Sequence, residues 1–371
     1  MENLGLNNDV LVGERKFHVQ TSFSDTKKVI VSNVFNEGQV IDSREVSANN
    51  GMSEAEVQNR MQEVHQELVT EMEILYYINE KVKAVRHAPS ANKLGLLFLQ
   101  KNLHDEAINQ FELALEIDPD YPEVYCNLGK SYLAQGNFER ALAVLEQGAQ
   151  HAPEFADLQN FLGIAYLHNG NHRQAVTHME KALKLNPNYI GVHYHLGMAY
   201  LAAGQTGQSS PDNIFRDKAT RHLKVAADKM INRHIPNFDK VMGLLSGGSE
   251  KEALDEFFQC TPNQVLSEFM SIENEFYLKF MYGGKGKDDT FIADYVSKLT
   301  DLLDEFPNYA DLRNNLGVAY LIQCRNLFLK SLDEFRGALK INPNFKKAEK
   351  NLKLAENDGK GFLILLRAIL K

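Results

Sequence analysis

One stretch of the chain combines the glycines and lysines that bind phosphate. Residues 282–288 have the sequence YGGKGKD, and nucleotide-binding loops hold phosphate oxygens with glycine N–H groups and a lysine ammonium. Such a loop requires a glycine separated by four residues from Gly-Lys-Ser/Thr. Met281 stands in place of that glycine, and Asp288 stands in place of the hydroxyl residue. The sequence therefore predicts a solvated loop here, not a nucleotide site.

Histidines are the second group that could do chemistry, because imidazole binds transition metals. Five of them gather within 28 residues: His168, His172, His178, His193 and His195. A metal site needs three or four ligands that converge on one point. These histidines are expected at the ends of different helices, or with neighbouring side chains that point apart. We therefore expect structural or polar roles for them, and we predict no metal, no cofactor, no catalytic residue and no enzymatic activity.

Composition places the chain among folded globular proteins. It has 371 residues, of which 44% are hydrophobic and 24% charged, and no run of 18 apolar residues that would span a bilayer. The first residues lack the cationic start and apolar core of a secretory signal. Three widely spaced cysteines, Cys126, Cys260 and Cys324, fit reduced thiols in a cytoplasmic protein. The net charge of −9 argues against nucleic acid as a partner.

Five kinds of residue recur with a period of 34 in the middle of the chain. The recurring positions are Gly95, Gly129, Gly163 and Gly197, the leucine before each, the aromatic residues Phe98, Tyr132, Tyr166 and Tyr200, the alanines Ala107, Ala141 and Ala175, and the prolines Pro119, Pro153 and Pro187. The leucine, glycine and aromatic positions share one face of a first helix. The alanine lies on a second helix, which the proline ends. Each period therefore predicts a helical hairpin.

This pattern resembles the tetratricopeptide repeat family, whose motif is L-G-x-x-Y, then A-x-x-x-F, then P. The tryptophan often found early in that motif is absent, and Ala91, Tyr125, Gln159 and His193 stand in its place. The resemblance implies a mainly α fold, an α-solenoid of helical hairpins that coil into a right-handed superhelix. It also implies a scaffold for protein–protein interaction.

The period divides the chain into segments. Residues 88–235 are expected to hold four repeats, with a loop insertion at about 204–216, and residues 236–309 about two degenerate repeats. Residues 310–345 are expected to form a final repeat, and residues 346–371 a capping helix, 346–356, followed by an amphipathic tail.

The resemblance also implies where a partner binds, because the first helices of such repeats line a concave groove. The positions that match are Asn92, Lys93, Leu96, Asn127, Lys130, Asn160, Phe161, Ile164, Tyr194, His195, Met198, Asn314 and Asn315. Asparagine amides donate and accept hydrogen bonds, so they suit a peptide backbone. We expect replacement of Asn127 or Asn160 to weaken peptide binding with little effect on stability. Family members that clamp the carboxylate of a chaperone tail are excluded, since Asp157 would repel a carboxylate.

Residues 1–87 have a different pattern. Alternating β-formers over 16–47 predict three antiparallel strands, and Ser53 with Glu56 forms a capping box that begins a helix running to about Ala84. Apolar residues from Val57 to Val82 follow a coiled-coil-like spacing along this helix. Two interpretations stay open: the apolar seam covers the sheet and caps the first repeat, or it forms a homodimer.

The C-terminal end is basic on an acidic chain, with 12 Lys and Arg against 6 Asp and Glu over residues 310–371. Residues 360–371, KGFLILLRAILK, form an amphipathic segment too short to cross a bilayer. Two interpretations again stay open. The tail covers the last repeat, or it lies on the surface of a membrane.

Taken together, these observations predict a cytoplasmic scaffold or adaptor that binds a protein or peptide partner. Two alternatives belong to other classes: an assembly or secretion co-chaperone for unfolded clients, and a regulatory subunit of an enzyme complex. A co-chaperone would bind many clients, whereas an adaptor would bind one partner in fixed stoichiometry.

Overall fold

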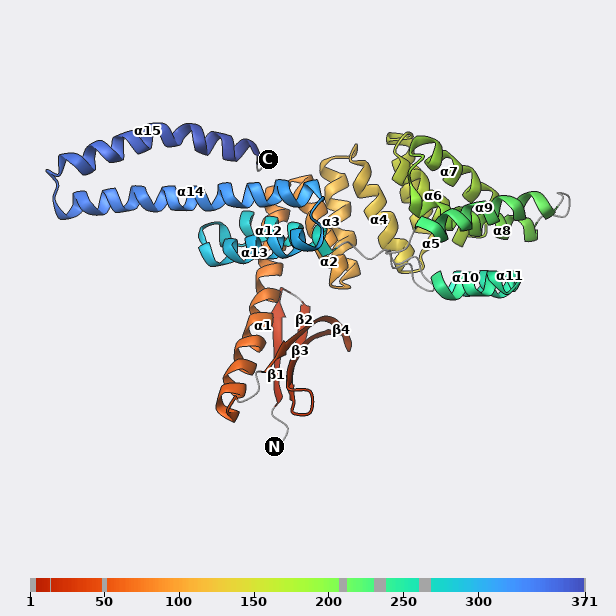
Figure 1. Cartoon of the computed structure of the whole chain (residues 1–371), viewed down its shortest axis with the longest axis horizontal. Coiled ribbons are helices and arrows are strands. Elements are labelled where there is room, and N and C mark those ends of the chain that lie inside the picture. Colours follow the sequence, from red (N-terminus) through yellow and green to blue (C-terminus); the bar gives the residue numbers. More distant parts are fainter. Residues whose placement is uncertain are drawn as a thin grey trace. The chain divides into compact units, whose positions relative to one another are not determined.

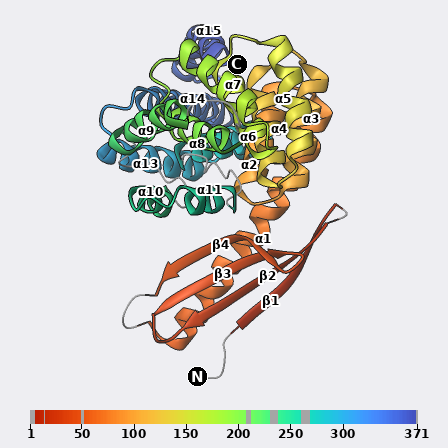
Figure 2. The same cartoon turned by 90° about the vertical axis from the view of Figure 1, so that its right-hand side faces the viewer.

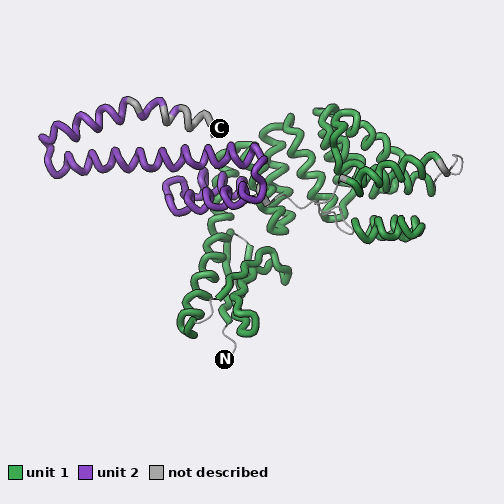
Figure 3. The backbone as a smooth tube through the Cα atoms, in the orientation of Figure 1, with its two compact units in different colours: residues 1–267 green, residues 268–371 purple. Residues whose placement is uncertain are grey.

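The computed structural model describes residues 5–13, 15–48, 52–206, 212–229, 238–259 and 268–369. The chain divides into two compact units, Met1–Ser267 and Glu268–Lys371, which Figure 3 colours green and purple. The first unit holds a sheet, a long helix and the repeats, and the second holds helices. Within the described residues, no helix has both the length and the apolar character needed to cross a membrane.

A four-stranded antiparallel sheet begins the first unit, with strands in the order β1-β2-β3-β4 (Figure 2). Its strands are β1 (Gly5–Val12), β2 (Arg15–Ser24), β3 (Val29–Asn36) and β4 (Gln39–Ser47). The expectation of three strands is therefore wrong by one. The missed strand is β1, an edge strand whose Asn7, Asn8 and Asp9 are exposed and whose buried residues are Val10 and Val12. Its polar residues hide the alternation by which a strand is recognised.

Helix α1 (Glu54–Val85) covers this sheet. It begins at the predicted capping box, in which Ser53 accepts from the Glu56 N–H and the Glu56 carboxylate accepts from the Ser53 N–H. Met61 and Val64 are fully buried in a cluster with Ile30 of the sheet. The apolar seam is therefore covered by the sheet of the same chain, which favours the first of the two interpretations.

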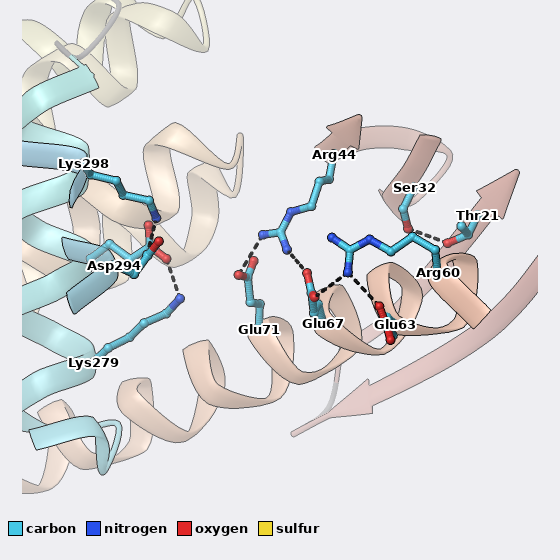
Figure 4. A network of polar contacts seen from close by, with 11 residues as sticks. Thr21, Ser32, Arg44, Arg60, Glu63, Glu67, Glu71, Lys279, Asp294 and Lys298 are labelled. Atoms are coloured by element: carbon cyan, nitrogen blue, oxygen red, sulfur yellow. Dashed lines mark hydrogen bonds and ion pairs between the residues drawn. The ribbon is translucent and has the colours of Figure 1, made fainter. Parts of the chain in front are cut away.

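Polar contacts also join the helix to the sheet. Arg44 of β4 donates to Glu67 and to Glu71 of α1, each at 2.8 Å (Figure 4). In the interior, the Thr21 hydroxyl lies 2.5 Å from the Ser32 hydroxyl and 2.9 Å from His65 Nδ1. Buried polar groups are costly unless paired, so these contacts favour one register of helix on sheet.

Four helical hairpins follow, as the period of 34 predicts. Their helices are α2 (Ala88–Gln100) with α3 (His104–Ile117), α4 (Pro122–Ala134) with α5 (Phe138–His151), α6 (Ala156–His168) with α7 (His172–Leu185), and α8 (Ile190–Thr206) with α9 (Asp212–Lys229). Gly136 and Gly170 end α4 and α6 at φ values of +71° and +78°, where glycine is unstrained. Part of the expected insertion lengthens α8, and residues 207–211 lie outside the described residues.

Within each hairpin, the recurring glycine permits close packing. A Cβ at Gly95 would lie 2.5 Å from the Phe111 ring, and a Cβ at Gly129 would lie 2.6 Å from Leu145. Both neighbouring side chains are fully buried. The glycine therefore lets the second helix of each repeat place a large side chain directly on the backbone of the first.

A separate hairpin ends the described part of the first unit. It consists of α10 (Phe238–Ser246) and α11 (Glu250–Gln259), and Gly248 makes the turn between them at φ +81°. Figures 1 and 2 show it beside α8, which α11 contacts.

The second unit contains α12 (Glu268–Met281), a 3₁₀ turn (Lys285–Lys287), α13 (Asp289–Glu305), α14 (Ala310–Ile341) and α15 (Lys346–Ile369). Its core includes Phe276, whose ring stacks on Tyr295 at 3.7 Å, and the fully buried Ile292 and Leu299.

Helix α14 differs from expectation, because residues 310–345 were expected to form a hairpin. Residues 322–327 have the sequence IQCRNL where the repeats have a glycine turn. Without a glycine to adopt positive φ, the helix continues for 32 residues.

Helix α15 extends the expected capping helix and packs back on α14. A Cβ at Gly359 would overlap the Phe328 ring, and Arg336 pairs with Glu356 at 3.0 Å. Most side chains of the tail beyond Gly361 lie outside the described residues, so its apolar face stays a prediction.

The glycine contacts predict the effect of adding one methyl group. Gly95→Ala should lower the free energy of unfolding by about 1–3 kcal/mol, because the rigid Phe111 ring must move. Gly317→Ala is the matched control, since Gly317 holds the same motif position in α14 with nothing within 4 Å of the added atom. It should stabilise its helix by about 0.5–1 kcal/mol. Urea unfolding of both full-length variants measures this, and equal effects would contradict the packing role.

Candidate functional site

The predicted binding residues divide between the two units. Eleven lie on the first helices of the four repeats, which pack side by side: Asn92, Lys93 and Leu96 on α2, Asn127 and Lys130 on α4, Asn160, Phe161 and Ile164 on α6, and Tyr194, His195 and Met198 on α8. We call the surface formed by these helices the inner face. Asn314 and Asn315 belong to α14 in the second unit, where Asn315 donates to Glu273 at 3.2 Å.

In the first two repeats, asparagines of the inner face bond to each other. Asn127 Nδ2 donates to Asn92 Oδ1 at 2.9 Å, and only 8% and 7% of these residues is exposed. The contact joins α4 to α2. Because removal of Asn127 would leave a buried partner behind, the bond predicts a loss of stability where the sequence alone predicts little effect.

Between the second and third repeats, charge and aromatic surface meet. Lys130 Nζ lies 4.4 Å from the centre of the Phe161 ring, and burial lowers the pKa of Lys130. Asn160 Nδ2 donates to the Tyr189 hydroxyl at 3.3 Å. The Asn160 Oδ1 atom is buried and accepts no hydrogen bond from the part of the chain that the structure describes. This part of the inner face therefore holds an amide acceptor and an ammonium group among apolar side chains.

In the last two repeats, the inner face is covered by α10 and α11. Phe257 lies 5.5 Å from His168, 5.7 Å from Tyr194 and 6.1 Å from His195, measured between ring centres. Phe258 lies 5.6 Å from His168. Burial lowers the pKa of both His168 and His195 to about 4. The Nδ1–H group of His195 donates to the Gly191 carbonyl. These imidazoles are therefore neutral members of an aromatic cluster.

The other residues considered for chemistry have structural roles. Asp288 caps α13 by accepting from the N–H groups of Thr290 and Phe291, and its carboxylate pairs with Lys285 at 2.9 Å. His178 bonds to Gln159, and His193 to His222, each at 2.9 Å. Among the residues that the structure describes, no three His, Cys, Asp or Glu side chains are grouped as metal ligands.

Sequence reasoning missed Phe257, Phe258 and Phe238 as members of this site. The signal that could have found Phe257 and Phe258 is the segment SEKEALDEFF, an amphipathic helix whose aromatic pair has no equivalent in the regular repeats. The sequence places this segment in a degenerate repeat. Its contacts with the third and fourth repeats join residues far apart in the chain, and such contacts leave no local pattern.

Two tetratricopeptide families match the chain, one described as TPR repeat over residues 95–136 and one as Tetratricopeptide repeat over residues 126–190. No curated protein matches it. A crystal structure of MamA is similar at 22% identity and a TM-score of 0.37, covering 48% of this chain and 95% of that one. MamA from residue 41 to its end, from Desulfovibrio magneticus RS-1, is similar at 20% identity and a TM-score of 0.37, covering 46% and 94%. The first TPR of Spaghetti (RPAP3), bound to the HSP90 peptide SRMEEVD, is similar at 20% identity and a TM-score of 0.31, covering 31% and 92%.

The bond between the asparagines predicts a stability effect. Asn127→Ala should lower the free energy of unfolding by about 1–3 kcal/mol, because the buried Asn92 oxygen loses its donor. Adding Asn92→Ala should cost less than a second such loss, since it removes the orphaned group. Asn314→Ala, at an exposed site, is the control and should change stability by less than about 0.5 kcal/mol. Strict additivity in urea unfolding would contradict the coupling.

The buried imidazoles predict a dependence on pH. The unfolded chain protonates a histidine near pH 6.5 and the folded chain near pH 4, so stability is complete above pH 6.5 and falls as the pH decreases toward 4. By pH 5 the loss should reach about 1–2 kcal/mol per histidine. Urea midpoints at pH 7 and pH 5 measure it, and His168→Gln should reduce the difference. A difference that His168→Gln leaves unchanged would show that other groups cause it.

Proposed function

The chain is a tetratricopeptide repeat protein, and from this we propose that it is a non-enzymatic scaffold which binds a peptide segment of a partner protein on its inner face. Tetratricopeptide repeat proteins are generally interaction scaffolds of this kind. The proposal places the protein in the cytoplasm, as its three widely spaced cysteines favour. A peripheral contact of residues 360–371 with a membrane is a separate expectation, tested by co-sedimentation with anionic vesicles.

The observation that carries the proposal is the buried Asn160 Oδ1 atom, which accepts no hydrogen bond from any residue that the structure describes. A buried carbonyl oxygen without a donor costs about 1–3 kcal/mol, so such atoms call for an explanation. A peptide bond entering beside Lys130 and Phe161 would supply the missing N–H donor. Its side chains would meet the apolar residues of the same face.

The alternatives predict different partners. A co-chaperone would bind many unfolded clients and suppress the aggregation of an unrelated unfolded protein. A regulatory subunit would be recovered with an enzyme whose activity it changes. A scaffold would capture one partner in fixed stoichiometry, which is the result that the discrete polar groups of the inner face favour.

The test is quantitative capture of partners by the immobilised full-length chain. Asn160→Leu removes the acceptor and preserves volume, so it should weaken capture of the stoichiometric partner at least tenfold while the fold is kept. Asn109→Leu, on the exposed surface of α3, is the matched control and should capture as the unmodified chain does. Equal capture by both variants would remove the inner face as the binding site.

A further inference from the structure

The α10–α11 hairpin does not continue the repeat array. Each regular repeat places its first helix against the second helix of the preceding repeat, as α4 packs on α3 and α8 on α7. The hairpin instead places α11 against α8, the inner helix of the fourth repeat. Its apolar residues therefore lie on the inner face, where the sequence predicts that a partner binds.

Three phenylalanines anchor this hairpin. Phe257 is only 6% exposed, and its ring contacts residues of both the third and the fourth repeat, His168 and Tyr194. Phe258 reaches His168 and His172, and Phe238 at the start of α10 lies 5.1 Å from Tyr194. Aromatic pairs at these separations contribute beyond simple burial of area.

Helix α11 has the amphipathic character of a helix that binds in a groove. Ala253, Leu254 and Phe257 form its buried stripe, and the sequence EKEALDEFFQ carries four acidic residues against one lysine. Glu250 pairs with Arg216 of α9 at 2.6 Å, which adds a charge contact to the fourth repeat. An amphipathic helix that lays an apolar stripe on a groove is an established mode of peptide recognition.

We infer that α11 is an internal ligand of the inner face at the third and fourth repeats. The partner that takes its place is an acidic amphipathic helix with two adjacent phenylalanines. This inference rests on the proposed function, because it identifies the kind of segment that the same inner face binds. Because α11 and the partner compete for the same surface, only molecules in which α11 has left the inner face can bind the partner. The apparent affinity for the partner is reduced in proportion to that fraction of molecules.

The experiment uses a fluorescent peptide of residues 238–259 and the full-length chain. The chain with Phe257→Ala and Phe258→Ala loses the anchors of α11 but keeps every receptor residue. Fluorescence anisotropy should show that this double variant binds the peptide at least tenfold more tightly than the unmodified chain. Asp255→Asn, on the exposed side of α11, is the matched control and should bind as weakly as the unmodified chain.

Two further measurements keep the outcome decisive. A peptide in which Phe257 and Phe258 are alanine should not bind any of these chains. Hydrogen exchange of α6 and α8 should show that the double variant keeps its repeats folded. Equal affinity of the unmodified chain and the double variant, or no binding to a folded double variant, would overturn the inference. Exchange of the hairpin between two copies, seen as a dimer by sedimentation that the double variant abolishes, would overturn the assignment within one chain. Neither result depends on Asn160→Leu, so the proposed function stands or falls separately.

Discussion

The array depends on the absence of a side chain at one position of each repeat. A Cβ at Gly163 would lie 2.6 Å from Met179, and a Cβ at Gly197 would lie 2.6 Å from Leu223. Real atoms do not approach so closely, so each contact exists only because the residue is glycine. Since the same approach recurs every 34 residues, neighbouring inner helices adopt the same spacing. The inner face is a consequence of that spacing, because equivalent positions of successive helices come to lie beside one another.

Where the close approach is lost, the array changes character. Gly317 keeps its place in the motif, but nothing lies within 4 Å of the atom that an alanine would add. The second helix that should pack there is absent, because α14 continues through the expected turn. The α10–α11 hairpin lacks the Leu-Gly-aromatic motif of the regular repeats, and α11 contacts the inner helix α8. The two departures differ in cause, since α14 lacks the turn glycine and the α10–α11 hairpin lacks the motif that carries the close approach.

The sequence predicts well what local spacing determines. The four hairpins, the capping box at Ser53 and the turn glycines Gly136 and Gly170 each follow from residues within one period. It predicts poorly what depends on distant partners. The bond between Asn92 and Asn127 spans two repeats, and it gives both residues a structural contact that their spacing does not predict. The edge strand β1 and the continuous helix α14 were missed for a different reason. Polar residues in β1 hide the alternation of a strand, and α14 keeps the repeat motif but lacks the glycine that would end its first helix.

The same distinction explains why the inner face is at once polar and covered. Amides on neighbouring helices can bond to each other, as Asn92 and Asn127 do although they occupy adjacent and not equivalent repeat positions, and such pairs need no ligand. The oxygen of Asn160, by contrast, is left without a donor in the described part of the chain. Beyond it, the face is apolar and aromatic around Tyr194, and there a helix of the same chain covers it. A partner that binds the whole face must therefore satisfy Asn160 and displace α11. The free energy of binding is then the difference between the free energy with which the partner helix binds the inner face and that with which α11 binds it. Modest changes in the phenylalanine pair of either helix therefore decide which helix is bound.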